Sequence, residues 1–141
     1  MKKKYLIILA DYYKEISKGL LKSALNFIPK SNKVKIIIVP GVFEIPVTIS
    51  KNIKKFDAFI ALGCVIKGQT PHFDFISQAT TQAIMNLSVE NKKPIGNGII
   101  TCLNISQARA RKKKGAEAAK AVISILSQKW ELILILKKTQ E

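Results

Sequence analysis

The sequence has 141 residues, of which 48% are hydrophobic and 23% charged. This length suits one domain with a sizeable core and excludes a two-domain enzyme, and the composition excludes a disordered chain. The net charge of +15 on its own points to an anionic partner, such as nucleic acid or a phosphorylated substrate. The lysines are dispersed along the chain, however, which favours a general compositional bias over a nucleic-acid-binding patch.

The sequence contains no stretch that approaches the roughly 18 consecutive apolar residues of a membrane span, so we expect a soluble protein. The basic N-terminus and the apolar run 5–10 mimic the start of a signal peptide, but the run is short and ends at Asp11. We interpret it as a first strand and expect a cytoplasmic protein. Cys64 and Cys102 lie in apolar runs, and their number and spacing suit neither a disulfide scaffold nor a metal cluster. Both are therefore expected to be reduced core residues.

Apolar runs alternate with helical periodicities along the chain. Four runs have the pattern of strands buried on both faces, namely 5–10, 34–39, 58–65 and 98–103. Three stretches between them repeat apolar residues at helical intervals, namely 16–28, 43–53 and 73–91. Pro46 is acceptable only in the first turn of its helix. Residues 106–136 have a helical pattern interrupted at Gly115, although 132–136 could equally form a strand on composition.

This alternation predicts an α/β fold over residues 1–141. Four buried strands connected by helices favour a four-stranded parallel sheet with right-handed crossovers and helices on both faces, which is a single-domain three-layer sandwich of the flavodoxin-like type. In such sheets ligands bind beyond the carboxyl ends of the strands. The residues that follow each strand are therefore the candidates for function.

The turn after the third strand, 68–71, has the features of an anion site. Gly68 is flexible, backbone N–H groups lie at a helix start, and Pro71 suits the first helical position. These amides and the helix dipole favour a phosphate, to which Thr70 could add its hydroxyl. Plain N-capping by Thr70 explains the turn equally well. The sequence has no GxxxxGK[ST] or GxGxxG motif after a strand, which argues against nucleotide hydrolysis.

His72 is the only histidine, and it falls in the first turn of the same helix. A lone histidine is more often a surface or structural residue. Beside an anion site, a side chain with an ordinary pKa of about 6.5 is the natural candidate for proton transfer. One histidine and two buried cysteines do not suggest a zinc site.

The only arginines are Arg109 and Arg111. A planar guanidinium is suited to phosphate recognition in a way that lysine is not, so one of the two is a candidate phosphate ligand. The alternative is a solvated helix face that continues into the lysines 112–114.

Aromatic residues follow the first two strands. Tyr12, Tyr13 and Phe43 supply rings, and Glu44 supplies a carboxylate. Aromatic residues at helix starts usually belong to the core, but a planar heterocycle that stacks on a ring and donates hydrogen bonds to a carboxylate would use this set.

Three segments together resemble the lumazine synthase family, namely 40–46 (PGVFEIP), 61–74 (ALGCVIKGQTPHFD) and 94–101 (PIGNGIIT). The resemblance runs in family order from the first strand to the segment 114–119 (KGAEAA). It implies a transferase of riboflavin biosynthesis that needs no cofactor or metal. The implied reaction is the penultimate step of that route, in which 5-amino-6-(D-ribitylamino)uracil condenses with 3,4-dihydroxy-2-butanone 4-phosphate to give 6,7-dimethyl-8-ribityllumazine, phosphate and water.

The resemblance also implies a role for each matching residue. His72 matches the residue that transfers protons, and Arg111, rather than Arg109, matches the arginine that binds the phosphate of the butanone. Gln69 and Thr70 match the pair whose amides hold that phosphate. The residues that match the set around the ribitylaminouracil are Tyr12, Val42, Phe43, Glu44, Cys64, Val65, Ile66 and Asn97. Many members have an aromatic residue from a neighbouring subunit at the position of Asn97.

The family further implies a homo-oligomer. Its members form pentamers, some of which assemble into 60-mer shells, and each site is completed by a neighbour, here around Asn97, Arg111 and Lys114. This chain has a shorter loop between Arg111 and Lys114, lacks the longer N-terminal segment of some members and is strongly charged. These features favour a free pentamer over a shell. The implied partners are small-molecule substrates and, functionally, riboflavin synthase, with no nucleic acid and no membrane.

Two other functions fit part of the sequence. A basic α/β module that binds nucleic acid is consistent with the composition, but it leaves the motifs at the strand ends unexplained. A flavin or nucleotide carrier without catalysis shares the fold, but it gives no reason for His72 beside an anion turn.

Overall fold

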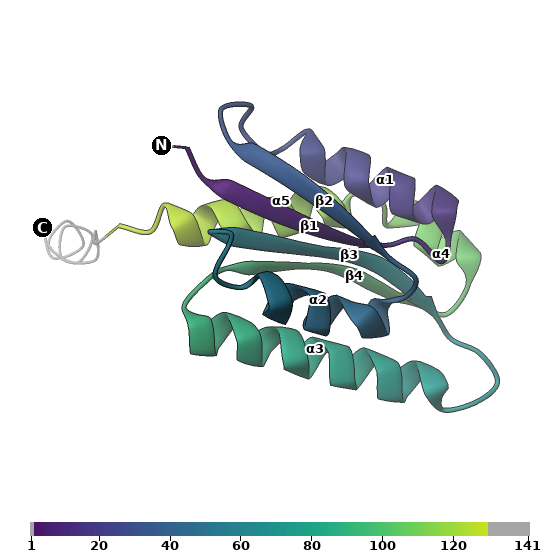
Figure 1. Ribbon diagram of the computed structural model, residues 1–141. Coiled ribbons are helices and arrows are strands. Elements are labelled where there is room, and N and C mark those ends of the chain that lie inside the picture. The colour runs from purple at the N-terminus through teal and green to yellow at the C-terminus, as the bar shows by residue number, and fades with distance from the viewer. Residues whose placement is uncertain (1, 130–141) are drawn as a thin grey trace, which may run out of the picture.

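The computed structural model describes residues 2–129, which contain one sheet in the order β2–β1–β3–β4 with every neighbouring pair parallel. The strands are β1 (Lys4–Ala10), β2 (Lys33–Val39), β3 (Ala58–Ile66) and β4 (Ile95–Cys102). The helices are α1 (Lys14–Leu25), the short 3₁₀ helix η1 (Val42–Glu44), α2 (Ile45–Asn52), α3 (His72–Asn91), α4 (Ile105–Ala110) and α5 (Lys114–Leu126). Figure 1 shows α1, α4 and α5 on one side of the sheet and α2 and α3 on the other. The predicted three-layer α/β fold is confirmed.

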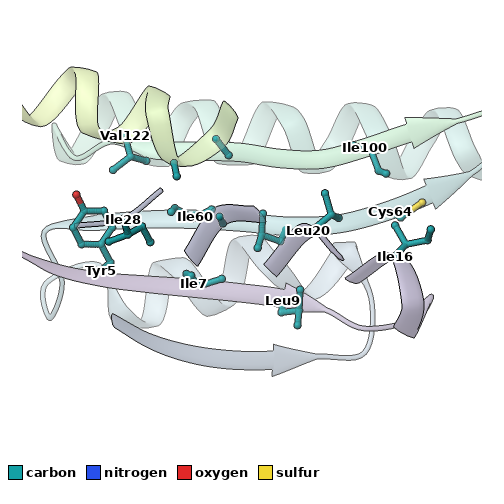
Figure 2. Close-up of a cluster of buried hydrophobic side chains, with 14 of the residues drawn as sticks. Tyr5, Ile7, Leu9, Ile16, Leu20, Ile28, Ile60, Cys64, Ile100 and Val122 are labelled. Carbon is teal, nitrogen blue, oxygen red and sulfur yellow. The ribbon is translucent and has the colours of Figure 1, made fainter. Parts of the chain in front are cut away.

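The central strand β1 serves two cores because its side chains alternate between the faces of the sheet. Tyr5, Ile7 and Leu9 belong to the cluster under α1 and α5, which Figure 2 shows in close-up. Leu6, Ile8 and Ala10 belong to the cluster under α2 and α3. All six side chains are buried, so the continuous apolar run of β1 reflects burial on both faces, as predicted.

The strand β2 differs from the prediction that it is buried on both faces. It lies at the edge of the sheet and pairs only with β1. Ile36 and Ile38 are 42% and 61% exposed, because the helices pack over the inner strands rather than over this edge. Lys33 and Lys35 lie on the same strand, and lysines of this kind discourage pairing with other chains.

The helices follow the predicted order, with one difference in the last helical stretch. As expected, Pro46 lies in the first turn of α2. The interruption in the last helical stretch falls at residues 111–113, between α4 and α5, and not at Gly115. The strand β4 begins at Ile95, three residues before the predicted start. The possible strand 132–136 lies outside the described residues. Within residues 2–129, no helix is long and apolar enough to cross a membrane.

Gly115 belongs to α5 and allows this helix to approach α1 closely. A Cβ atom at this position would overlap with the carbonyl oxygen of Leu20. Next to it, the Ala116 N–H donates a hydrogen bond of 2.8 Å to Ser23 Oγ, which ties the start of α5 to α1. The glycine is therefore required by packing rather than by a break in the helix.

We expect Gly115→Ala to lower the free energy of unfolding by about 1–3 kcal/mol, because a backbone oxygen cannot rotate away from the added methyl group. This loss would occur although alanine forms helices better than glycine by roughly 1 kcal/mol. Urea unfolding measures the difference. Gly68→Ala is the control, because a Cβ at Gly68 meets no atom within 4 Å. Equal stability of the two variants would show that α1 and α5 separate without cost.

Candidate active site

A cavity of about 680 Å³ lies at the carboxyl ends of the strands, within the usual size range of ligand pockets. Its walls come from segments far apart in the sequence, which the parallel sheet brings to one edge. The lining residues are Tyr12 and Tyr13 after β1, Gly41, Val42, Phe43 and Glu44 after β2, Cys64, Val65 and Ile66 at the end of β3, and His72 and Ile76 from α3. Candidate residues that follow β1, β2 and β3 therefore line one shared cavity.

Two of the aromatic side chains that line this cavity, Tyr12 and Phe43, are exposed. Tyr12 is 74% exposed and Phe43 is 61% exposed, so neither ring is used by the core. Tyr13 packs edge-on against Tyr12 with ring centroids 4.9 Å apart. An exposed aromatic face beside a carboxylate, here Glu44, suits a planar ligand with N–H groups.

The turn after β2 is held close to the sheet. A Cβ on Gly63 of β3 would overlap with a methyl group of Val42, so the glycine lets η1 settle directly on the strand. The Glu44 N–H donates to the Gly41 carbonyl oxygen at 3.2 Å, and the Thr48 hydroxyl donates to the Glu44 carbonyl oxygen at 2.8 Å. These contacts fix Phe43 and Glu44 at the rim of the cavity.

The loop from β3 to α3 carries the predicted anion site. Within residues 2–129, the N–H groups of Gln69 and Thr70 have no hydrogen-bond partner and are available to a ligand. Thr70 Oγ1 accepts a long hydrogen bond of 3.4 Å from the His72 N–H, but the N-cap residue of α3 is Pro71 and no side chain caps the helix, so Thr70 is not the N-cap. Pro71 was predicted to be the first residue of the helix. In the structure α3 begins at His72, and Pro71 is the residue just before it.

Cys64 forms part of the cavity wall but is not a nucleophile. Burial, together with the neighbouring Cys102 thiol, raises the pKa of Cys64 to about 12. The thiol is therefore protonated at neutral pH, and the reactive thiolate is scarce. Figure 2 shows Cys64 at the end of the buried cluster, with Ile16 and Ile100. Both cysteines are free and buried, as predicted.

The two arginines have different surroundings. Arg109 Nε lies 3.5 Å from Glu15 Oε1 in an exposed ion pair with α1. Arg111 Nη1 donates a hydrogen bond of 3.1 Å to the Gln107 carbonyl oxygen. The Arg111 residue also lines a second cavity of about 520 Å³ along β4. The residues that line this second cavity with Arg111 are Asn97, Ile99, Ile100, Thr101, Ala110, Lys113, Lys114 and Glu117.

The predicted site is thus divided between two places in one chain. Eight predicted residues, including His72, line the cavity at the strand ends, and Gln69 and Thr70 lie on the adjoining loop. Asn97 and Arg111 line the second cavity, and among the described residues none lines both. The residue-by-residue prediction missed Ile76 and Lys113. Ile76 follows His72 by four residues, so helical spacing could have found it.

Comparison with known proteins identifies relatives over almost the whole described region. The family model of 6,7-dimethyl-8-ribityllumazine synthase matches residues 2–129. The 6,7-dimethyl-8-ribityllumazine synthase of Bartonella bacilliformis is 41% identical over 133 residues, covering 85% of this chain and 88% of the relative.

Two further relatives have similar extents. The 6,7-dimethyl-8-ribityllumazine synthase 1 of Rhodopseudomonas palustris is 39% identical over 140 residues, covering 90% of this chain and 86% of the relative. That of Cutibacterium acnes is 39% identical over 133 residues, covering 88% and 80%. A match of this length and identity is not produced by a shared fold alone, and the chain belongs to the 6,7-dimethyl-8-ribityllumazine synthase family.

Proposed function

We propose that this chain condenses 5-amino-6-(D-ribitylamino)uracil with 3,4-dihydroxy-2-butanone 4-phosphate to form 6,7-dimethyl-8-ribityllumazine, phosphate and water. Membership of the family implies this reaction. The observation that carries it in the structure is the cavity at the strand ends, where open aromatic rings, a carboxylate and the only histidine lie together.

The chemistry assigns a part to each wall of the cavity. The pyrimidine stacks on the exposed ring of Tyr12 or Phe43, and Glu44 accepts hydrogen bonds from its N–H groups. The free N–H groups of Gln69 and Thr70 receive the phosphate. His72 transfers protons as the imine forms with loss of water, phosphate leaves and the ring closes with loss of another water.

The position of Arg111 favours a site shared between subunits. The family implies homo-oligomeric assembly, and Arg111 and Asn97 lie in a cavity apart from the one that His72 lines. We infer that the two cavities face each other across a subunit interface. A free pentamer is favoured over a 60-mer shell, because the connection between α4 and α5 is only residues 111–113 and the charge of +15 adds repulsion.

The alternative of a nucleic-acid-binding module is not favoured. Several cations beside the second cavity are engaged by the protein, since Glu15 pairs with Arg109 and Lys112, and Glu117 pairs with Lys114. The family match also accounts for the motifs at the strand ends, which such a module leaves unexplained. A cytoplasmic location and a functional link to riboflavin synthase complete the proposal.

We expect the purified protein to form the lumazine from its two substrates, followed by absorbance and fluorescence. His72→Ala should slow turnover about 10²–10⁴-fold with little change in substrate binding, because general acid/base catalysis contributes that much. Residual activity is expected, since positioning two reactive substrates also accelerates the reaction. His72 is exposed, so the variant should fold normally. A variant with the rate of the unmodified protein would remove His72 from the mechanism.

We expect Arg111→Ala to raise the KM for the butanone phosphate roughly ten- to a hundredfold and to leave the KM for the pyrimidine nearly unchanged. Loss of a charged hydrogen-bond donor to phosphate costs on the order of 1.5–3 kcal/mol. Arg109→Ala is the matched control and should be mild, because its ion pair with Glu15 is exposed. Equal increases in both KM values would contradict the assignment of Arg111.

A mixture of two impaired variants tests the shared site, at a butanone phosphate concentration far below the raised KM of Arg111→Ala, where both variants are slow. If His72 and Arg111 of each site come from different chains, coassembly of His72→Ala with Arg111→Ala subunits should rebuild about a quarter of the sites by random mixing. A site within one chain would give no such recovery. Sedimentation of the same sample should report a mass of about five chains, whereas about sixty chains would contradict the argument from the short connection.

A further inference from the structure

The connection between α4 and α5 places four consecutive cations, residues 111–114, beside the cavity along β4. Arg111, Lys113 and Lys114 line this cavity, whereas Lys112 does not. The contacts of each lysine decide which of them is available to a ligand.

Lys112 is committed to α1. Its aliphatic stem lies on Gly19, where a Cβ atom would overlap with the lysine Cδ. Its ammonium group lies 3.5 Å from Glu15 Oε1. The side chain therefore seals the contact between α1 and the start of α5, and its charge is balanced outside the cavity.

Lys114 is also balanced by the protein. Its ammonium group lies 3.3 Å from Glu117 Oε2, one helical turn further along α5. Glu117 is the only carboxylate among the residues that line the cavity, so this pair uses the negative charge available there.

Lys113 is the remaining lysine of the segment 111–114. It lines the cavity with Arg111 and is exposed, and within residues 2–129 it takes part in no ion pair. As the residue that precedes α5, its side chain makes no capping hydrogen bond. Lys113 therefore contributes to the cavity lining a charge that has no ion-pair partner within residues 2–129.

We propose that Lys113 is a second phosphate-binding residue, acting beside Arg111 on the phosphate of the butanone substrate and on the phosphate released from it. This inference rests on the proposed function. A phosphate monoester carries a charge of about −1.5 to −2 at neutral pH, which one guanidinium cannot balance. Arg111 supplies a planar fork that fixes orientation, and Lys113 supplies a point charge with three donors that neutralises the rest.

Lys113→Gln and Lys112→Gln form a matched pair, since each removes one charge from neighbouring positions. We expect Lys113→Gln to raise the KM for the butanone phosphate about tenfold, with the KM for the pyrimidine and kcat changed less than about twofold. The inhibition constant of inorganic phosphate should rise by a similar factor, Lys112→Gln should change neither quantity, and Lys113→Arg should retain phosphate binding. Because an exposed charge is screened, the effect of Lys113→Gln should shrink at high salt.

Two results would overturn the proposal. One is a Lys113→Gln variant that matches Lys112→Gln in both the KM for the butanone phosphate and inhibition by inorganic phosphate. The other is a fall in kcat with an unchanged KM, which would give Lys113 a role other than binding. Sedimentation confirms that each variant assembles like the unmodified protein.

A wrong proposed function would give a different result from a wrong assignment of Lys113. The unmodified protein would then form no lumazine from the two substrates. Direct titration of the unmodified protein and Lys113→Gln with inorganic phosphate, followed by ³¹P NMR, would still test Lys113. Equal phosphate affinities in that titration would overturn the inference by themselves.

Discussion

Parallel pairing of β1 with both of its neighbours is the constraint on which the rest of the structure depends. Its side chains are buried on both faces, and β2 and β3 use both of its edges. Parallel pairing requires every connection to cross back over the sheet, so all carboxyl ends meet at one edge. Tyr12, Glu44 and His72 are far apart in the sequence, and this arrangement brings them to one cavity.

Local ion pairing, rather than total charge, decides what the excess of lysine does near the site. Nine acidic residues face 24 basic ones, so one-to-one pairing would leave 15 cations without a carboxylate partner. Glu15 holds Arg109 and Lys112 on the side of α1, and Glu117 holds Lys114. Among residues 2–129, these two acidic residues pair with Arg109, Lys112 and Lys114, whereas Arg111 and Lys113 line the cavity along β4 without an ion pair.

The elements that the sequence predicted well are those whose burial leaves a pattern in their own residues. The runs of β1 and β3 were recognised because burial on both faces leaves a continuous apolar pattern. β2 has the same pattern but is an edge strand, since its coverage depends on strand order and on where the helices pack. Gly115 was interpreted as a helix break because its contact with Leu20 depends on α1, whose position the local pattern does not contain.

The candidate site was predicted as a group for a related reason, because residues that follow parallel strands must converge. The separation of Arg111 from His72 was not predictable in this way. It follows from where α4 ends and α5 begins relative to β4, which is a property of packing rather than of spacing.

The protonated thiol of Cys64 affects how the cavity wall reacts with a carbonyl compound. A hydroxyketone is an electrophile, and a thiolate in the wall would add reversibly to its carbonyl carbon to give a hemithioketal once the oxygen takes up a proton. With a pKa of about 12, Cys64 offers almost no thiolate at neutral pH. The cavity wall can therefore contain a sulfur atom without offering a thiolate that competes with an amine for a carbonyl carbon.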